Sequence, residues 1–239
     1  MSAFSACEEI VHRRDPDRYF SALFAPAGKR PFLFALYAFN YELARVAETA
    51  REPMLADIRL AWWREAVEGA RAGKPRDHPV VQALAETLAA NNLPAAWFER
   101  LIEARAFDAS ADTFADMAAL EAYADATSGN LMRLAARVLS AEADGPARQA
   151  GIAYALAGLL RSIPFHAARD KRFLPDGLLG DARRRTRHHL TAARKIAMPA
   201  EALPAFLPAA LVPLYLKRSD PPLWRKQIAL LWAAIRGGI

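Results

Sequence analysis

The amino-acid sequence predicts an all-α protein, and three features carry this prediction. Nearly every segment repeats its apolar residues with the three-to-four-residue spacing of a helix. No run of alternating apolar and polar residues, which would indicate a half-buried strand, stands out. Prolines stand near the starts of several segments, where a helix tolerates a residue without an N–H.

The expected helices follow one another with breaks at Gly and Pro. We expect them at about residues 28–50, 53–73, 78–91, 94–108, 116–140, 146–162, 180–197 and 221–236, with a proline-punctuated helical stretch at 199–216. The helix at 116–140 is expected either whole or broken near Ser128-Gly129. Pro164 is expected to end the helix at 146–162, and residues 165–180 are expected to form a loop.

The helix at 28–50 changes character along its length. Its first half, from Phe32 to Phe39, is apolar on all sides, which predicts a buried position in the middle of the domain. Its second half is polar, which in a helical bundle indicates the mouth of a cavity. Large aromatic residues of this helix and the next are expected in the core: Tyr37, Phe39, Trp62 and Trp63.

Length and composition favour one domain over residues 1–239, because 239 residues with 54% hydrophobic content bury a sizeable core and no linker or repeat is evident. The single cysteine, Cys7, excludes an internal disulfide. The uncharged stretch from Ala202 to Leu216 is short and holds three prolines, so we do not expect it to span a membrane. We expect a cytoplasmic protein, soluble or peripheral on the inner membrane.

Charge is distributed unevenly. Residues 165–239 hold 14 Lys/Arg against 5 Asp/Glu, whereas the rest hold 18 against 21. A basic C-terminal third would suit an anionic membrane surface, a diphosphate or an acidic protein. Alternatively, Arg183-Arg184-Arg185 and Arg187 form a solvated helix face. No motif for nucleic-acid binding accompanies the charge.

General catalytic motifs are not found. The chain has no Gly-rich phosphate loop, zinc spacing or nucleophile elbow. Cys7 lies near a terminus and is not expected to be a nucleophile. His188 and His189 are adjacent, so on a helix they point about 100° apart and make a poor chelate.

Three stretches match one family in order and spacing. They are Tyr19-Phe20-Ser21-Ala22-Leu23-Phe24-Ala25-Pro26 with Lys29-Arg30, Ala35-Leu36-Tyr37-Ala38-Phe39, and Leu159-Leu160-Arg161 with Arg169 and Phe173-Leu174-Pro175. Tyr123 with Ser128-Gly129 adds a fourth match. Together they resemble the squalene/phytoene synthase family over most of the chain.

The resemblance implies a single-domain isoprenoid-synthase fold, with helices around a central cavity. Active members join two prenyl diphosphates head to head. Two aspartate-rich motifs on facing helices bind Mg²⁺, which holds the diphosphates, because hard cations bridge carboxylate and phosphate oxygens.

The sequence departs from the family at both motifs. The first, Asp-Asp-x-x-Asp, falls on Ala44 to Glu48, where Glu48 is the remaining acid and Arg45 takes a ligand position. The second, Asp-x-x-x-Asp, falls on Ser162 to His166, and both aspartates are replaced. Since Arg45 would repel Mg²⁺, we expect no catalytic residue, metal or cofactor.

A second set of matches narrows the resemblance. The segments are Phe39-Asn40-Tyr41-Glu42-Leu43-Ala44, Trp62-Trp63-Arg64, His78-Pro79-Val80 and Pro164-Phe165-His166-Ala167-Ala168-Arg169. They resemble a divergent branch of the family, whose eukaryotic members are mitochondrial factors for assembly of respiratory complex I. This chain is similar to a bacterial relative of that branch.

The residues at the family's motif sites are the candidates for ligand binding: Tyr41, Arg45, Glu48, Arg161, Ser162, His166 and Arg169. Arg45 would replace the metal ion by binding an anionic head group with its guanidinium, and Arg161 and Arg169 would join it. The alternative for Arg45 is an ordinary helix ion pair with Glu42 or Glu48. His166 is also a candidate acid or base near neutral pH.

Three functions remain open. The favoured one is a catalytically degenerate family member that binds an isoprenoid, lipid-like ligand or protein partner and supports complex I assembly. The alternative is an active Mg²⁺-dependent prenyltransferase acting on prenyl diphosphates. The third is a helical scaffold whose cavity is filled by side chains.

Overall fold

The computed structural model describes residues 2–50, 52–110, 112–140, 143–167 and 173–239. Every regular element in these ranges is helical, which confirms the predicted all-α class. The α-helices are α1 (Ala3–Arg14), α2 (Pro16–Ala22), α3 (Arg30–Thr49), α4 (Pro53–Arg71), α5 (Pro79–Ala90), α6 (Ala95–Ala104), α7 (Ala106–Ala109), α8 (Met117–Ala124), α9 (Asn130–Leu139), α10 (Asp144–Ala167), α11 (Leu179–Lys195), α12 (Leu203–Phe206), α13 (Val212–Lys217) and α14 (Leu223–Arg236). A π-helical turn, η1 (Asp125–Gly129), joins α8 to α9, and the 3₁₀ turns are η2 (Asp176–Leu178), η3 (Ala200–Ala202) and η4 (Leu207–Leu211).

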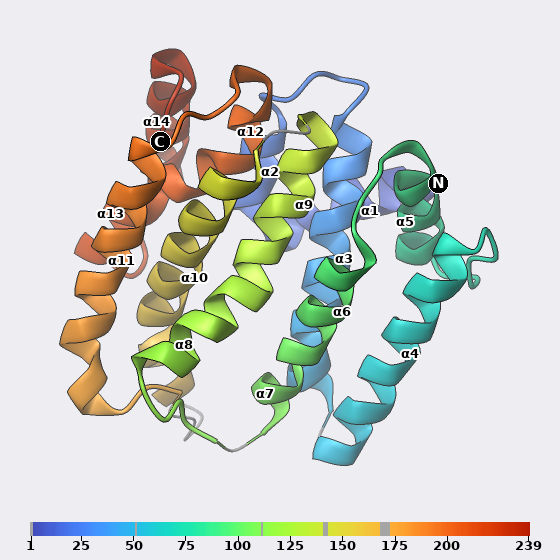
Figure 1. Cartoon of the computed structure of the whole chain (residues 1–239), viewed down its shortest axis with the longest axis horizontal. Helices are drawn as coiled ribbons and strands as arrows, with labels where there is room; N and C mark the ends of the chain where they lie inside the picture. The colour runs from blue at the N-terminus through green and yellow to red at the C-terminus, as the bar shows by residue number, and fades with distance from the viewer. Residues whose placement is uncertain (1, 51, 111, 141–142, 168–172) are drawn as a thin grey trace.

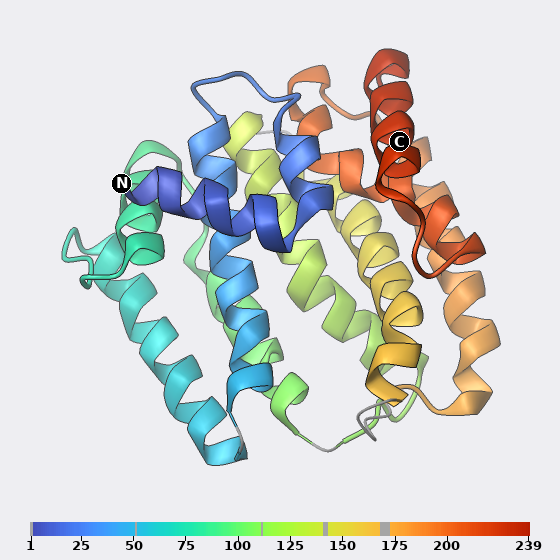
Figure 2. The same cartoon turned by 180° about the vertical axis from the view of Figure 1, so that it is seen from behind.

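Helices α3, α9 and α10 run side by side through the middle of the molecule (Figure 1). Helices α4 and α5 pack on the α3 side, and α11 and α13 pack against α10. Figure 2 shows α1 crossing the back of the molecule, where it contacts α3 and α5. Within the described ranges, no helix is long and apolar enough to span a bilayer.

The apolar first half of α3 is buried as predicted, except for Phe32, which is half-buried. All residues from Leu33 to Asn40 are buried, including Tyr37 and Phe39. Trp63 is buried against Phe39, with 5.6 Å between ring centroids. Trp62 differs from the prediction because it is only half-buried and lines a surface groove.

Three predicted boundaries are corrected. Pro164 does not end α10, which continues to Ala167, because one missing hydrogen bond in the final turn of a 24-residue helix is tolerated. The helix expected at 94–108 is interrupted at Arg105, which separates α6 from α7. By contrast, one of the two forms expected for 116–140 is found, since the segment stays helical through Ser128-Gly129, where a π-turn absorbs the irregularity. The predicted loop at 165–180 is also shorter, since α11 begins at Leu179.

The π-turn permits a close backbone contact. A Cβ atom added to Gly151 of α10 would lie 2.6 Å from the Cα of Gly129 and 2.7 Å from the carbonyl oxygen of Ser128. Only glycine allows this approach. The contact therefore fixes the distance between α10 and the turn that carries Ser128.

Helices α1 and α2 were not predicted from the sequence. Ser2 caps α1 by accepting a hydrogen bond from the backbone N–H of Ser5. Asp15 caps α2 in the same way, accepting from the N–H of Arg18, and Pro16 takes the first position of that helix. A polar cap followed by proline is a helix-start signal, so this pattern was readable at residues 15–16.

Candidate functional site

The interior of the fold holds a polar cluster that begins on α2. Asp17 and Ser21 lie one turn apart and are both buried. The Ser21 hydroxyl donates to the backbone carbonyl of Asp17 at 2.7 Å. The side chain of Asp17 is left to accept hydrogen bonds from other helices.

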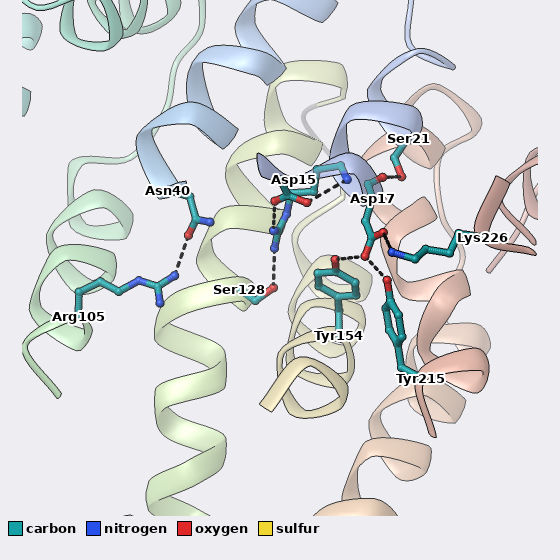
Figure 3. Close-up of polar contacts among 10 residues, drawn as sticks. Asp15, Asp17, Ser21, Asn40, Arg105, Ser128, Tyr154, Tyr215 and Lys226 are labelled. Carbon is teal, nitrogen blue, oxygen red and sulfur yellow. Dashed lines mark hydrogen bonds and ion pairs between the residues drawn. The ribbon is translucent and has the colours of Figure 1, made fainter. Parts of the chain in front are cut away.

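Asp17 joins four helices through its carboxylate (Figure 3). The hydroxyl of Tyr154 on α10 donates to it at 2.9 Å, and the hydroxyl of Tyr215 on α13 donates to the same oxygen. The ammonium group of Lys226 on α14 lies 3.0 Å from the other oxygen. Burial and the negative charge of Asp17 raise the pKa of both tyrosines, so both stay protonated as donors.

Arg18, the next residue, points into the same interior. Its guanidinium donates to Asp15 at 2.6 Å and to the hydroxyl of Ser128 at 3.2 Å. Its central carbon lies 5.7 Å from the ring centroid of Tyr37 and 5.0 Å from that of Tyr154. The cation is thus held by one carboxylate, one hydroxyl and two aromatic faces.

A second arginine, Arg105, lies where α6 and α7 meet. Its guanidinium donates to Asn40 of α3 at 2.9 Å (Figure 3). It also donates to Asp108 at 2.9 Å and to the Tyr123 hydroxyl at 3.2 Å. Tyr123 in turn donates to Asp108 at 2.5 Å. This network links the buried half of α3 to α8.

Tyr123 also borders an open hollow of about 670 Å³ between α6 and α8. Phe107 and Phe114 line it with their rings stacked, 4.1 Å between centroids. Alanines form much of the remaining lining, with Arg100, Glu103 and Asp112 among the polar members. An apolar hollow of this size, bordered by polar groups, suits a hydrophobic ligand.

The position of the family's first motif lies elsewhere, at the exposed end of α3. The guanidinium of Arg45 is 3.6 Å from the carboxylate of Glu42. Both residues line a groove of about 310 Å³ with residues of α4 and the start of α5: Arg59, Trp62, Trp63 and His78. Arg45 thus forms the helix ion pair that the sequence allowed, and its positive charge is partly balanced.

The other candidates are dispersed. Tyr41 is half-buried, and Glu48 is exposed. Arg161 is half-buried and stacks on Tyr215, 4.4 Å from the ring centroid, beside the Asp17 cluster. Ser162 donates to the carbonyl of Leu159 in its own helix at 2.9 Å.

Arg169 and the side chain of His166 lie outside the described residues. Arg45 and Arg161 have different recorded partners: Glu42 for one, and Tyr215 for the other. Among the residues described, these two guanidiniums therefore share no partner. Ligand binding by either stays a prediction.

Magnesium does not fit the donor set that the described residues supply. At the first motif, Arg45 stands beside Glu42 and leaves Glu48 as the one acid of that motif. Ser162 at the second motif bonds its own helix. No group of three or more His, Cys, Asp or Glu side chains that could hold a metal occurs among the residues described. Magnesium prefers carboxylate oxygens, and neither motif position offers a pair of them.

Sequence reasoning missed the residues that form the interior cluster: Asp17, Arg18, Arg105, Tyr154, Tyr215 and Lys226. One signal was present, since Tyr154 precedes Arg161 by seven residues and so shares its helical face. The positions of α2, α13 and α14 relative to α10 could not be read from spacing.

The other titratable residues singled out in the sequence are either held by neighbouring groups inside the protein or exposed to solvent. Cys7 is buried, which raises the pKa of its thiol to about 12 and keeps it protonated. The ring of His189 contacts Gln149 at 2.6 Å and Glu121 at 3.1 Å, whereas His188 is exposed. Arg183, Arg184, Arg185 and Arg187 are exposed on α11, as expected for a solvated face.

The fold and the matched motifs define a class of protein. The family model for squalene/phytoene synthase matches residues 11–194. The chain belongs to the squalene/phytoene synthase family. In agreement, the crystal structure of a dehydrosqualene synthase in complex with ligand superposes with a TM-score of 0.83, over 98% of this chain and 96% of that one, at 16% identity.

Two curated relatives mark different branches of the family. Complex I assembly factor 6 (NADH dehydrogenase, ubiquinone) of Mus musculus is 30% identical over 240 residues, which cover 89% of this chain and 72% of the relative. Phytoene synthase of Rhodobacter capsulatus is 27% identical over 179 residues, which cover 71% of this chain and 51% of that enzyme. The similarity to the assembly factor thus extends over more of both chains.

Proposed function

We propose that this chain is a catalytically degenerate family member that supports the assembly of a respiratory NADH dehydrogenase. The observation that carries the proposal is the Arg45–Glu42 ion pair at the first motif, where an active synthase needs free carboxylates. The extent of the similarity to complex I assembly factor 6 supports a place in the assembly-factor branch of the family.

The proposal includes a ligand of isoprenoid or lipid-like chemistry, or a protein partner. The apolar hollow bordered by Phe107, Phe114 and Tyr123 supports a hydrophobic ligand. The basic C-terminal third supports a position at an anionic membrane surface, where a respiratory complex is assembled.

An activity assay separates this proposal from the prenyltransferase alternative. The purified chain is incubated with farnesyl or geranylgeranyl diphosphate, with and without Mg²⁺ and NADPH, and pyrophosphate release is followed. We expect no release above that of a heat-denatured sample. Magnesium-dependent formation of a head-to-head product would overturn the degenerate site.

A rescue experiment tests the cellular role. Cells that lack complex I assembly factor 6 receive this chain with a mitochondrial targeting sequence, and their NADH:ubiquinone oxidoreductase activity is measured. We expect partial recovery, whereas the Rhodobacter capsulatus phytoene synthase, delivered in the same way, gives none. Equal recovery by both would show that the branch-specific residues have no part in the role.

A further inference from the structure

Helix α14 is apolar on two opposite sides, and only one of them is buried. Leu230 and Ala233 face the body of the protein and are buried. The opposite side exposes five large apolar residues: Trp224, Ile228, Leu231, Trp232 and Ile235. Their spacing of four, three, one and three residues places them in a single stripe about 100° wide.

The exposure within this stripe is large. Trp224 is 55% exposed, Trp232 is 56% and Ile235 is 69%. Exposed apolar residues on a protein surface are usually scattered singly. A continuous apolar stripe with two tryptophans therefore indicates a surface that another molecule covers. Figures 1 and 2 place α14 at the edge of the molecule, on the side opposite to α4.

The stripe belongs to a helix that is fixed in position. Lys226, on the inward side, is held by the buried carboxylate of Asp17 at 3.0 Å. Gly237 ends the helix in the left-handed conformation, with φ at 69°. Arg194 of α11 then donates to the backbone carbonyl of Ile239 at 2.8 Å. The outward side is therefore presented on a fixed element.

Cations border the stripe. The guanidinium carbon of Arg225 lies 5.1 Å from the ring centroid of Trp224, and that of Arg236 lies 5.3 Å from the ring centroid of Trp232. Residues 217–239 contain five Lys/Arg and one acid, Asp220. Tryptophan with flanking arginine is the combination that occupies the boundary between lipid head groups and acyl chains.

We propose that the outward side of α14 lies flat on an anionic lipid bilayer. The proposal rests on the membrane position proposed above and names the surface responsible. The tryptophans and isoleucines of the stripe enter the head-group boundary, and Arg225 and Arg236 contact lipid phosphates. The tryptophans are about 12 Å apart along the axis, so both reach one plane. A single convex helix with cations along its edge fits a charged plane.

Vesicle binding by the full chain tests the proposal. The protein is mixed with vesicles of phosphatidylcholine, or of phosphatidylcholine with phosphatidylglycerol, and the bound fraction is measured by flotation at low and high salt. We expect binding to the anionic vesicles that weakens with salt, and little binding to neutral ones. Absence of binding, or equal binding to both vesicles, would overturn the proposal.

Paired variants locate the contact. Ile228→Ser/Ile235→Ser keeps both tryptophans as fluorescence reporters, and we expect its partition coefficient to fall at least about tenfold. Met54→Ser/Ile58→Ser on α4 removes apolar side chains that are 70% and 59% exposed, and should bind as the wild type does. Thermal unfolding checks that both variants stay folded. An equal loss in both would exclude α14 as the specific contact.

A second copy of the chain is the competing occupant. If the wild type is a dimer that Ile228→Ser/Ile235→Ser dissociates, and neither form binds vesicles, the stripe is a subunit interface and the lipid proposal is wrong. The complex I rescue is scored independently. Rescue without vesicle binding would leave the proposed function standing while the lipid contact fails.

Discussion

Asp17 and Arg45 are both charged residues near the middle helices of this fold, but their surroundings differ. Asp17 is buried between four helices and receives two tyrosine hydroxyls and a lysine. Arg45 lies at the exposed end of α3 beside one carboxylate. The first arrangement holds helices together, and the second leaves a charge accessible to solvent or a ligand. Burial, more than residue type, separates structural charge from charge that can bind.

The largest expected effect comes from Asp17→Ala. It leaves Lys226 without its carboxylate and two buried tyrosine hydroxyls without an acceptor, so we expect a loss of about 3–5 kcal/mol in the free energy of unfolding. Urea denaturation followed by circular dichroism measures it. Glu48→Ala, which removes an exposed carboxylate from α3, serves as the control and should change stability by less than about 0.5 kcal/mol. Similar losses in both variants would break the comparison.

Gly151→Ala tests whether the backbone contact beneath the cluster matters as much as its charges. The added methyl would meet backbone atoms that cannot rotate away, so α10 must shift from Ser128. We expect a loss of about 1–3 kcal/mol. Gly158→Ala is the matched control on the same helix. Its added Cβ has open space, and better helix propensity should stabilise it by up to about 1 kcal/mol. A gain in both variants would show that the contact is not tight.

Glu121 is intermediate in burial between Asp17 and Arg45. It is half-buried, and its carboxylate accepts from the exposed Arg185 at 2.7 Å. Its hydrogen bond from Arg185 lowers its pKa below the ordinary 4.5. Stability from this pair is therefore present above pH 4.5 and lost as pH falls through the folded-state pKa. We expect Glu121→Gln to lose about 1 kcal/mol at pH 7 and much less near pH 3. Denaturation at several pH values tests this, and a loss independent of pH would contradict it.

Arg45→Ala should have the smallest effect. Arg45 is exposed and its nitrogen lies 3.6 Å from the half-buried Glu42, so we expect stability to change by no more than about 0.5 kcal/mol. Thermal unfolding at low and high salt gives the value. A loss of several kcal/mol would mean that the first-motif position has become part of the core. A small loss leaves Arg45 available for an anionic ligand, which is one of the two interpretations that the sequence left open.

The central helix, the helical class and the family were predictable from the sequence, whereas the interior cluster was not. The apolar run from Phe32 to Phe39 predicted a buried helix, because a helix that is apolar on all sides has no side suited to solvent. The motif positions of Arg45 and Arg161 were located by the resemblance to the family's segments. The separate partners of these two arginines could not be predicted. Spacing within a helix shows which residues share a face but does not identify the helix that packs on it.

The sequence by itself determined most of the helices, the replaced carboxylates and the basic C-terminal third. The tertiary structure alone decided that Asp17 accepts from Tyr154, Tyr215 and Lys226, residues that are 137 to 209 positions away. It also decided which side of α14 is uncovered. Local periodicity reports how apolar each side of a helix is. Contact between distant segments depends on how all the helices pack together, and no local pattern records that.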